Sequence, residues 1–298
     1  MEGMRATRAE PRAEGVHATP LPAPYASRYV KADGLKLHYL DYGTEGRAPM
    51  LCVHGGAAHA HWFDYVAPGF TADYHVRSID LRGHGDSEAV DPPSYLYKDY
   101  ASDLAAAVET LDLRDFVLVG HSMGGMVSLL YAATYPGRVK ALVVADTMMN
   151  LPAERIATLR DVGSRPGSTY ATQEELVSRY RLRPGHSVAP TEVVRHIAQH
   201  SARQLADGTW KLKFDRNVYA TRESHDGRPY WSRIRIPALL VRAEASERIT
   251  PEIYAEVKAC CPQAGIAEIS RSGHHVTLDN APAFVQVVKS FLARNEKT

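Results

Sequence analysis

Residues 117–125 read Val-Leu-Val-Gly-His-Ser-Met-Gly-Gly, and this segment most constrains what the chain can fold into. Its first residues form an apolar run typical of a buried strand, and a helical pattern follows Gly125. Ser122 therefore lies in Gly-x-Ser-x-Gly at a predicted strand-to-helix turn, where glycines prevent clashes with the strand and the helix. The motif alone is weak evidence. With this strand and helix around it, we interpret Ser122 as a nucleophile and not as part of a structural turn.

Short apolar runs alternate with helical patterns along most of the chain. A hairpin is predicted around Asp33-Gly34. The further predicted strands are residues 50–53, 75–79, 116–119, 141–145, 238–241 and 265–269, and the helices between the early ones are residues 97–111 and 125–135. This alternation predicts an α/β fold with a mostly parallel central sheet flanked by helices on both faces.

The alternation stops between residues 148 and 235, where the chain is more polar and has amphipathic helical patterns at 173–180 and 191–206. We expect residues 148–235 to form a helical cap over the carboxyl edge of the sheet, with residues 27–147 and 236–298 as the core. A separate domain is the alternative, but the segment has few apolar residues for its own core. Residues 1–26, rich in Ala, Pro, Arg and Glu, are predicted to be a flexible arm.

The bulk composition excludes several classes of protein. The formal net charge is +1, which gives no reason to expect a nucleic-acid partner or an anionic membrane surface. No apolar run approaches the roughly 18 residues of a membrane span, and the first residues lack the apolar core of a secretory signal. The expected location is the cytoplasm, and the expected partner is a small molecule. The oligomeric state stays open.

Cysteine and histidine spacing predicts neither a metal site nor a cofactor. The three cysteines, Cys52, Cys260 and Cys261, suggest no disulfide framework and no metal-ligand spacing. His59 and His61 are two positions apart, without a third ligand in the pattern. The chain also has no phosphate-binding fingerprint. We therefore expect chemistry carried by side chains alone.

Five motifs along the chain resemble those of the α/β-hydrolase superfamily, in the order that this family shows. They are His54-Gly55-Gly56, residues 80–87, the Ser122 turn, residues 236–241 before an acidic loop, and residues 272–275. The resemblance runs from about residue 28 to the end. It implies the α/β-hydrolase fold and a serine esterase-like member with a helical cap, which cleaves a small or medium carboxylic ester through an acyl-enzyme intermediate.

A serine hydroxyl is a poor nucleophile at neutral pH, so it needs a base and an acid that orients that base. The family resemblance places the base at His274, after Gly273 near the end of the chain. His275 is the alternative, because adjacent side chains point in different directions and only one of them can face Ser122.

The acid is the hardest residue to assign. The resemblance places it in the loop after residues 238–241, which contains no Asp, and the register there indicates Glu247. Glutamate serves as well as aspartate in such triads. Glu244 in the same loop and Asp146 at the end of the preceding strand are the alternatives, since some family members carry the acid at the latter place.

Acyl transfer also needs N–H donors for the oxyanion, which typically lower the barrier by about 3–4 kcal/mol. In this fold one donor is the residue after the nucleophile, here Met123, and the other lies in the loop after the third strand, here Gly56. The alternative is that these glycines only form a tight turn.

Other functions stay open at this point. Lactonases and amidases use the same constellation of residues, and a carbon–carbon bond hydrolase of the same fold is the nearest enzymatic alternative. A ligand-binding member that has lost catalysis is the remote alternative, suggested only by the unusual acid loop. The reading of Ser122 and His274 as intact catalytic residues argues against it.

Overall fold

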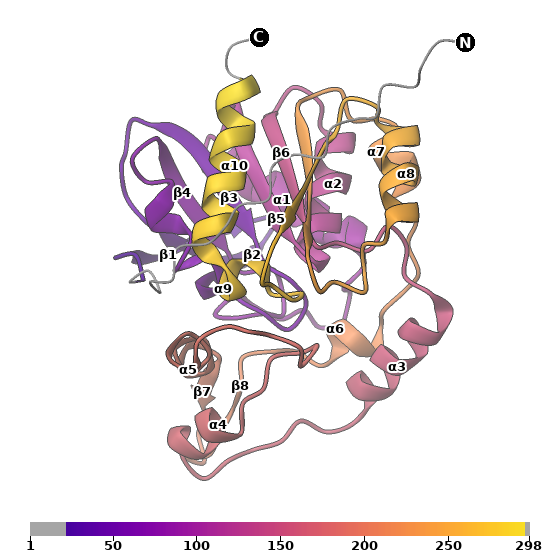
Figure 1. The fold of residues 1–298 in the computed structure, drawn as a ribbon. Coiled ribbons are helices and arrows are strands. Elements are labelled where there is room, and N and C mark those ends of the chain that lie inside the picture. Colours follow the sequence, from indigo (N-terminus) through magenta and orange to yellow (C-terminus); the bar gives the residue numbers. More distant parts are fainter. Residues whose placement is uncertain (1–21, 296–298) are drawn as a thin grey trace, which may run out of the picture.

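The computed structural model of the protein describes residues 22–295. Within this range, eight strands form one sheet in the order β1-β2-β4-β3-β5-β6-β9-β10 (Figure 1). The strands are β1 (Ala26–Ala32), β2 (Leu35–Asp41), β3 (Ala48–Val53), β4 (Tyr74–Ile79), β5 (Phe116–His121), β6 (Val139–Ala145), β9 (Ala238–Ala243) and β10 (Gly265–Ile269). Strands β1 and β2 form the predicted hairpin and pair antiparallel, β2 also pairs antiparallel with β4, and all later neighbours are parallel. The predicted α/β architecture is confirmed.

The central strands are apolar throughout because both faces of the sheet are covered. In β3, Met50 and Cys52 pack into one hydrophobic core, whereas Leu51 and Val53 pack into the other. Helices α1 (Tyr97–Thr110), α2 (Met123–Thr134) and α8 (Pro251–Cys260) contribute to the second core, and α10 (Ala281–Asn295) with the 3-10 turn η1 (Ala60–Phe63) contributes to the first. The remaining short helices of the core are η2 (Ala67–Gly69) and α9 (Val276–Asp279). No helix within residues 22–295 is long and apolar enough to cross a membrane.

The segment between β6 and β9 leaves the sheet and returns to it. It contains α3 (Ala153–Ser164), α4 (Gln173–Arg179), α5 (Thr191–His200), β7 (Ala202–Gln204), β8 (Trp210–Leu212), α6 (Asn217–Ala220) and α7 (Arg228–Trp231). Figure 1 shows α3 to α6 gathered beyond the end of the sheet at which β5 and β6 finish. This arrangement brings the inserted segment over the carboxyl edge, where ligands bind in folds of this kind.

Helix α5 is shorter than its sequence pattern predicts. The predicted helix covered residues 191–206, but α5 ends at His200 and a hairpin of β7 and β8 follows. The turn of this hairpin contains Asp207-Gly208, and Gly208 has a φ of +84°. Asp-Gly is a strong turn signal because glycine adopts positive φ without strain. The hairpin around this turn therefore ends the helix before the helical pattern of the sequence ends.

The residues just before β1 contact the core. Residues 1–21 of the predicted N-terminal arm lie outside the described residues. Ala23 is buried, and its N–H donates to the carbonyl oxygen of Asp64 at 2.9 Å. The Tyr25 ring lies edge-on to that of His61, with 5.0 Å between the ring centres. The chain therefore joins the core before residue 27, earlier than predicted, because residues 22–25 find backbone and aromatic partners there.

Candidate active site

Ser122 lies at the turn between β5 and α2. Its backbone has φ 54° and ψ −118°, a conformation that costs a non-glycine residue on the order of 1–3 kcal/mol. A Cβ on Gly120 would lie 2.4 Å from the carbonyl oxygen of Gly124, and a Cβ on Gly124 would lie 2.3 Å from that of His54. Both positions therefore require glycine. The turn presents the half-buried Ser122 side chain at the carboxyl end of the sheet.

His274 reaches the Ser122 hydroxyl from the loop after β10. Its Nε2 lies 3.0 Å from Ser122 Oγ, and its Nδ1 lies 2.7 Å from Asp146 Oδ2. Because a carboxylate only accepts hydrogen bonds, Nδ1 carries the proton and Nε2 offers its lone pair to the hydroxyl. The alternative, His275, donates from Nε2 to the Pro184 carbonyl of the inserted segment at 3.0 Å. The structure thus brings the predicted base, and not its neighbour, to Ser122.

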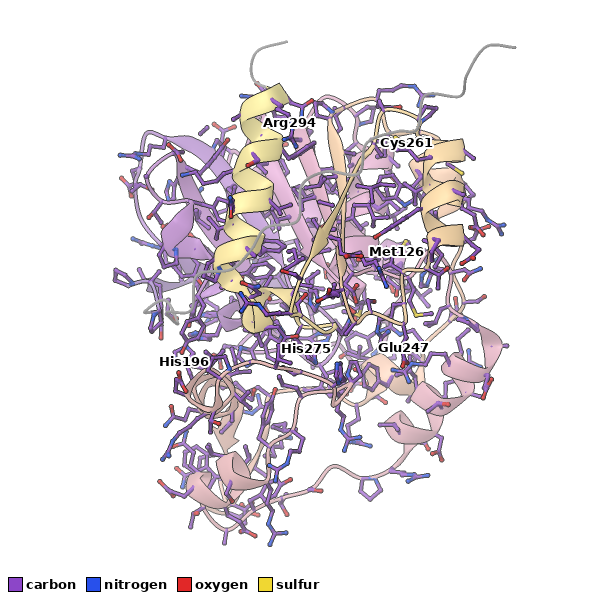
Figure 2. All side chains as sticks on the ribbon, viewed as in Figure 1. Met126, His196, Glu247, Cys261, His275 and Arg294 are labelled. Carbon is purple, nitrogen blue, oxygen red and sulfur yellow. The ribbon has the colours of Figure 1, made fainter. Side chains whose placement is uncertain are left out.

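The carboxylate beside His274 is Asp146, and the prediction of Glu247 is wrong. Asp146 directly follows β6, the neighbour of β5 in the sheet, so the end of β6 lies against the Ser122 turn. The Ser122 N–H donates to the carbonyl of Ala145 at 2.8 Å. Glu247 follows β9, which is one strand further away, and its side chain is exposed. Figure 2 shows Glu247 at the face of the core that turns toward the inserted segment.

The loop that was predicted to supply the acid supplies a hydroxyl instead. Ser246 Oγ donates to Asp146 Oδ2 at 3.0 Å, and the Ala243 N–H donates to Asp146 Oδ1 at 3.2 Å. Together with the imidazole, these donors hold a carboxylate that is fully buried. The other alternative, Glu244, is exposed and accepts the Arg271 N–H at 2.8 Å. Asp146 alone of the three candidates therefore has the contact that a triad acid needs.

The electrostatics of the triad favour a neutral imidazole. Burial holds the pKa of His274 well below its usual value, and the nearby Arg248, His275 and Arg155 lower this pKa further. Burial raises the pKa of Asp146, although the hydrogen bond from Ser246 opposes that rise. A neutral His274 at physiological pH can accept the proton of Ser122.

We expect the enzymatic activity to persist into acidic solution. A general base works only when it is unprotonated, so the rate falls as the pH drops through the pKa of His274. Since that pKa is lowered, the acid limb of kcat/KM should have its midpoint below 6.5, the ordinary value for histidine. A pH profile from about pH 4 to 8 with a substrate of constant charge measures this midpoint. Arg248→Gln should move the midpoint upward, and a wild-type midpoint at or above pH 6.5 would contradict the expectation.

His121 is a positioning residue that the sequence motif did not reveal. Its Nε2–H donates to the carbonyl oxygen of His274 at 2.7 Å, and the His121 ring is buried behind the base. Burial keeps the pKa of His121 well below its usual value, so its ring is neutral. Many residue types occur between Gly and Ser in this motif. The motif therefore does not predict the hydrogen bond from His121 to His274.

The loop after β3 packs against the Ser122 turn, as predicted for an oxyanion site. A Cβ on Gly55 would lie 3.1 Å from Ser122 Cβ, and a Cβ on Gly56 would lie 3.6 Å from Met123 Sδ. Met123 is the first residue of α2, so its N–H has no acceptor within the helix. The Gly56 N–H has no backbone acceptor among residues 22–295. Two N–H donors without a backbone acceptor in the described part of the chain thus lie beside the hydroxyl.

The loop is held in place by His54. The Nε2 of His54 accepts the Leu81 N–H at 3.0 Å, so the proton is on Nδ1, which donates to the Gly55 carbonyl at 2.7 Å. His54 is fully buried, and burial lowers its pKa. A neutral imidazole with this tautomer links the loop after β3 to the loop after β4. The motif His-Gly-Gly therefore contains a histidine that fixes the position of the loop, as well as the glycine expected to donate its N–H to the oxyanion.

Ser122 faces a pocket of about 160 Å³ between the core and the inserted segment. Aromatic and apolar side chains such as Trp62, Tyr97, Leu159 and Tyr219 form part of its lining. The lining also contains several arginines and, among the described residues, no aspartate or glutamate. These arginines are Arg155, Arg181, Arg183, Arg222 and Arg248. The pocket beside Ser122 is therefore strongly cationic.

Arg222 is the most buried of these arginines, with 3% of its surface exposed. Its Nη2 lies 2.8 Å from Met123 Sδ, and its guanidinium lies 5.2 Å from the centre of the Tyr97 ring. Its Nε and Nη1 have no hydrogen-bond partner among the described residues. A buried cation without a carboxylate is unfavourable, so an anionic group of a ligand would be stabilised strongly here.

Groups of side chains of the metal-ligating kind occur elsewhere in the described part of the chain. One contains His38, Asp80 and Asp86, and the other contains His61, Asp64, His196 and His200; none of these residues lines the pocket. His59, the other histidine of the sequence pair, instead lies with its Nε2 2.8 Å from Ser201 Oγ.

The sheet is mostly parallel, and a strained serine follows its fifth strand. A histidine contacts this serine, and an aspartate contacts the histidine. This combination is characteristic of one class of protein, the α/β hydrolases. Residues 48–281 match the family model described as alpha/beta hydrolase fold. This chain belongs to that family.

Several proteins with similar sequences carry the word hydrolase in their names. The chain is 36% identical over 114 residues to a "Serine hydrolase-like protein" of Danio rerio, a match that covers 38% of this chain and 35% of that protein. It is 28% identical over 290 residues to a "Putative 2-succinyl-6-hydroxy-2,4-cyclohexadiene-1-carboxylate synthase" of Bacillus subtilis, covering 88% of this chain and 96% of the relative. The crystal structure of E-2-(acetamidomethylene)succinate hydrolase has the same fold, with a TM-score of 0.80, 22% identity and coverage of 91% and 100%.

Proposed function

We propose that this protein is a serine hydrolase that cleaves a small ester bearing a free carboxylate. The observation that carries the proposal is the cationic pocket: five arginines and, among the described residues, no acid line the space that Ser122 faces. The contacts of Ser122 with His274, and of His274 with Asp146, support the acyl-enzyme route. The segment 148–235 acts as a cap in this proposal, because it contributes part of the pocket lining.

The proposed reaction begins with attack of Ser122 Oγ on the acyl carbon while His274 Nε2 takes the hydroxyl proton. The N–H groups of Gly56 and Met123 donate to the oxyanion that forms. The tetrahedral intermediate collapses, and the imidazolium gives its proton to the departing alkoxide. Asp146 fixes the tautomer of His274 and stabilises its charged form.

Water then completes the cycle. His274 takes a proton from a water molecule, whose oxygen attacks the acyl carbon of the Ser122 ester. Collapse of the second intermediate releases the carboxylic acid, and the proton returns to Ser122 Oγ through the imidazole. One water molecule is consumed, and the products are an acid and an alcohol.

The guanidinium groups bind the second carboxylate of the substrate in this proposal. Arginine suits this role because its planar fork forms paired hydrogen bonds with a carboxylate. The name of the Bacillus subtilis relative also contains a carboxylate and a succinyl group, which supports an anionic ligand. Arg222 is the central candidate, since its Nε and Nη1 are buried and have no partner among residues 22–295.

Arg222→Gln is expected to lower kcat/KM for a carboxylate-bearing ester by about 10- to 100-fold, because hydrogen bonds to charged groups contribute about 1.5–3 kcal/mol. The matched neutral substrate, in which the free carboxylate is capped as an amide, should be affected much less. The comparison uses two paired esters, each measured with the wild type and the variant. Arg233→Gln, at an exposed position of the inserted segment, is the control.

Equal losses for the charged and the neutral ester would contradict the assignment of Arg222. The same substrate skeleton offered as an ester, an amide and a vinylogous diketone separates the proposed activity from its alternatives. Preferred cleavage of the ester supports the proposal, whereas preferred cleavage of the diketone would make the protein a carbon–carbon bond hydrolase.

A further inference from the structure

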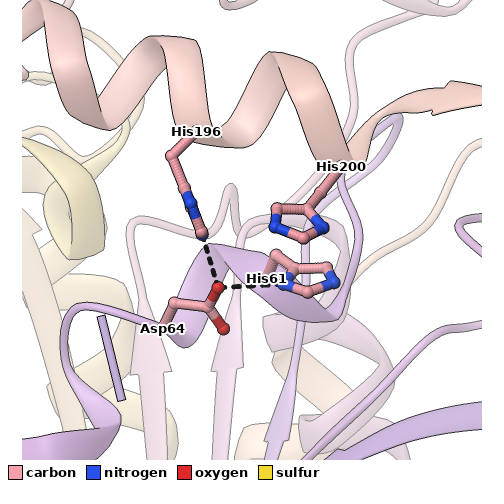
Figure 3. A group of neighbouring side chains, drawn as sticks. All are labelled: His61, Asp64, His196 and His200. Atoms are coloured by element: carbon pink, nitrogen blue, oxygen red, sulfur yellow. Dashed lines mark hydrogen bonds and ion pairs between the residues drawn. The ribbon is translucent and has the colours of Figure 1, made fainter. Parts of the chain in front are cut away.

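Three histidines surround one buried aspartate at the contact between the core and the inserted segment (Figure 3). His61 lies on η1 and Asp64 directly follows it, while His196 and His200 lie on α5. Asp64 Oδ2 lies 2.9 Å from His61 Nδ1 and 2.6 Å from His196 Nε2. The His200 ring stacks on that of His61 with 3.6 Å between the ring centres.

The spacing within each element suits metal binding. His196 and His200 are four residues apart, so both project from one face of α5, a spacing that zinc sites on helices use. One ligand atom from each of His61, Asp64, His196 and His200 can be chosen so that all four lie within 4.8 Å of one another. In a tetrahedral zinc site these atoms are about 3.3 Å apart, so small side-chain movements would bring them to a common ion.

One histidine of the cluster, His200, takes no part in the hydrogen bonds to Asp64. The side chain of His200 makes no hydrogen bond or ion pair with another residue among 22–295, although those of His61 and His196 both contact the aspartate. The position of Asp64 is fixed from behind, because Tyr42 O–H donates to Asp64 Oδ1 at 2.7 Å. Metal-binding carboxylates commonly have such a supporting donor.

We propose that His61, Asp64, His196 and His200 form a binding site for a divalent transition-metal ion, with Zn²⁺ as the best match to three imidazoles and one carboxylate oxygen. A divalent ion would replace the two imidazole–carboxylate hydrogen bonds with coordination bonds and recruit His200. The site is separate from the reaction at Ser122. Its role is structural, because it would tie α5 of the inserted segment to η1, the turn that also carries the pocket residue Trp62.

The sequence did not predict this site because only one of its histidines belongs to the pair that the spacing singled out. Two ligands come from residues 61–64 and two from residues 196–200, more than 130 positions later. Neither half alone has enough ligands to hold an ion. The fold brings the halves together, and the helix period then aligns the second pair.

The test uses the full-length chain without a purification tag, stripped of metal with a chelator and titrated with Co²⁺. We expect one equivalent to bind with visible absorption bands typical of a four-coordinate ion and without the charge-transfer band of a thiolate ligand. Zn²⁺ should displace Co²⁺ stoichiometrically and raise the midpoint of thermal unfolding. Absence of the cobalt bands in the wild type would overturn the proposal, whatever the variants do.

The variants assign the ligands. His196→Ala and His200→Ala should each weaken Zn²⁺ binding by at least about 100-fold, since even loss of a residue that supports a ligand costs 10- to 100-fold. Tyr42→Phe should weaken it less. His186→Ala removes an exposed histidine of the same inserted segment and should leave binding unchanged. Circular dichroism checks that each variant is folded, and unchanged affinity in folded His196→Ala and His200→Ala would overturn the assignment.

Discussion

Replacing Ser122 with alanine is expected to lower kcat on the order of 10⁶-fold, because the acyl-enzyme can no longer form. The fold should persist, since alanine removes only one oxygen from a half-buried side chain. The measurement is hydrolysis of a chromogenic carboxylate-bearing ester, together with labelling by a fluorophosphonate probe. Wild-type protein should label at Ser122, and the variant should not label.

Ser128→Ala is the matched control for this experiment. Ser128 lies on the same helix, α2, is fully buried, and its Oγ has no hydrogen-bond partner among the described residues. Its loss should leave both turnover and labelling intact. Substantial ester hydrolysis by Ser122→Ala would defeat the assignment of the nucleophile. A wild type that neither turns over esters nor labels would revive a purely ligand-binding role.

Asp146→Asn is expected to lower kcat about 10⁴-fold, the loss seen when a triad aspartate becomes an amide and the imidazole is held in the wrong tautomer. The reason here is geometric: Asp146 Oδ2 lies 2.7 Å from His274 Nδ1 and accepts a hydrogen bond from its N–H. An amide NH₂ at that place would favour a proton on Nε2, where it blocks acceptance from the Ser122 hydroxyl. Steady-state kinetics with the same ester measure the loss.

The carboxylates of the neighbouring loop provide the comparison. Glu247→Gln and Glu244→Gln change exposed side chains and should alter kcat by less than about twofold, because surface substitutions away from the site have small effects. Ser246→Ala should have an intermediate effect through its hydrogen bond to Asp146. A large loss in Glu247→Gln, with near-normal activity in Asp146→Asn, would reverse the assignment.

Local patterns were enough to predict the sheet. The run before Ser122 is apolar at every position because β5 is buried on both faces, and such runs separated by helical periods are typical of parallel sheets. The α5 boundary was missed because the helical period continues to residue 206, whereas the chain leaves the helix after His200 and enters a hairpin whose turn contains Asp207-Gly208. Helix periodicity says which face is apolar, but turn residues decide where the helix ends.

The sequence by itself determined the strand-to-helix turn at Ser122 and the glycines around it, because each depends on residues adjacent along the chain. The family resemblance indicated His274, and the structure decided between it and His275 by placing His274 Nε2 3.0 Å from Ser122 Oγ. Only the tertiary structure decided the acid, since the order of strands in the sheet puts the end of β6 beside the nucleophile and the loop after β9 one strand away. The same holds for the arginines around the pocket and for the histidines around Asp64. They come from segments far apart in the chain. The separation of two residues along the sequence does not indicate whether their side chains lie close together in the folded protein.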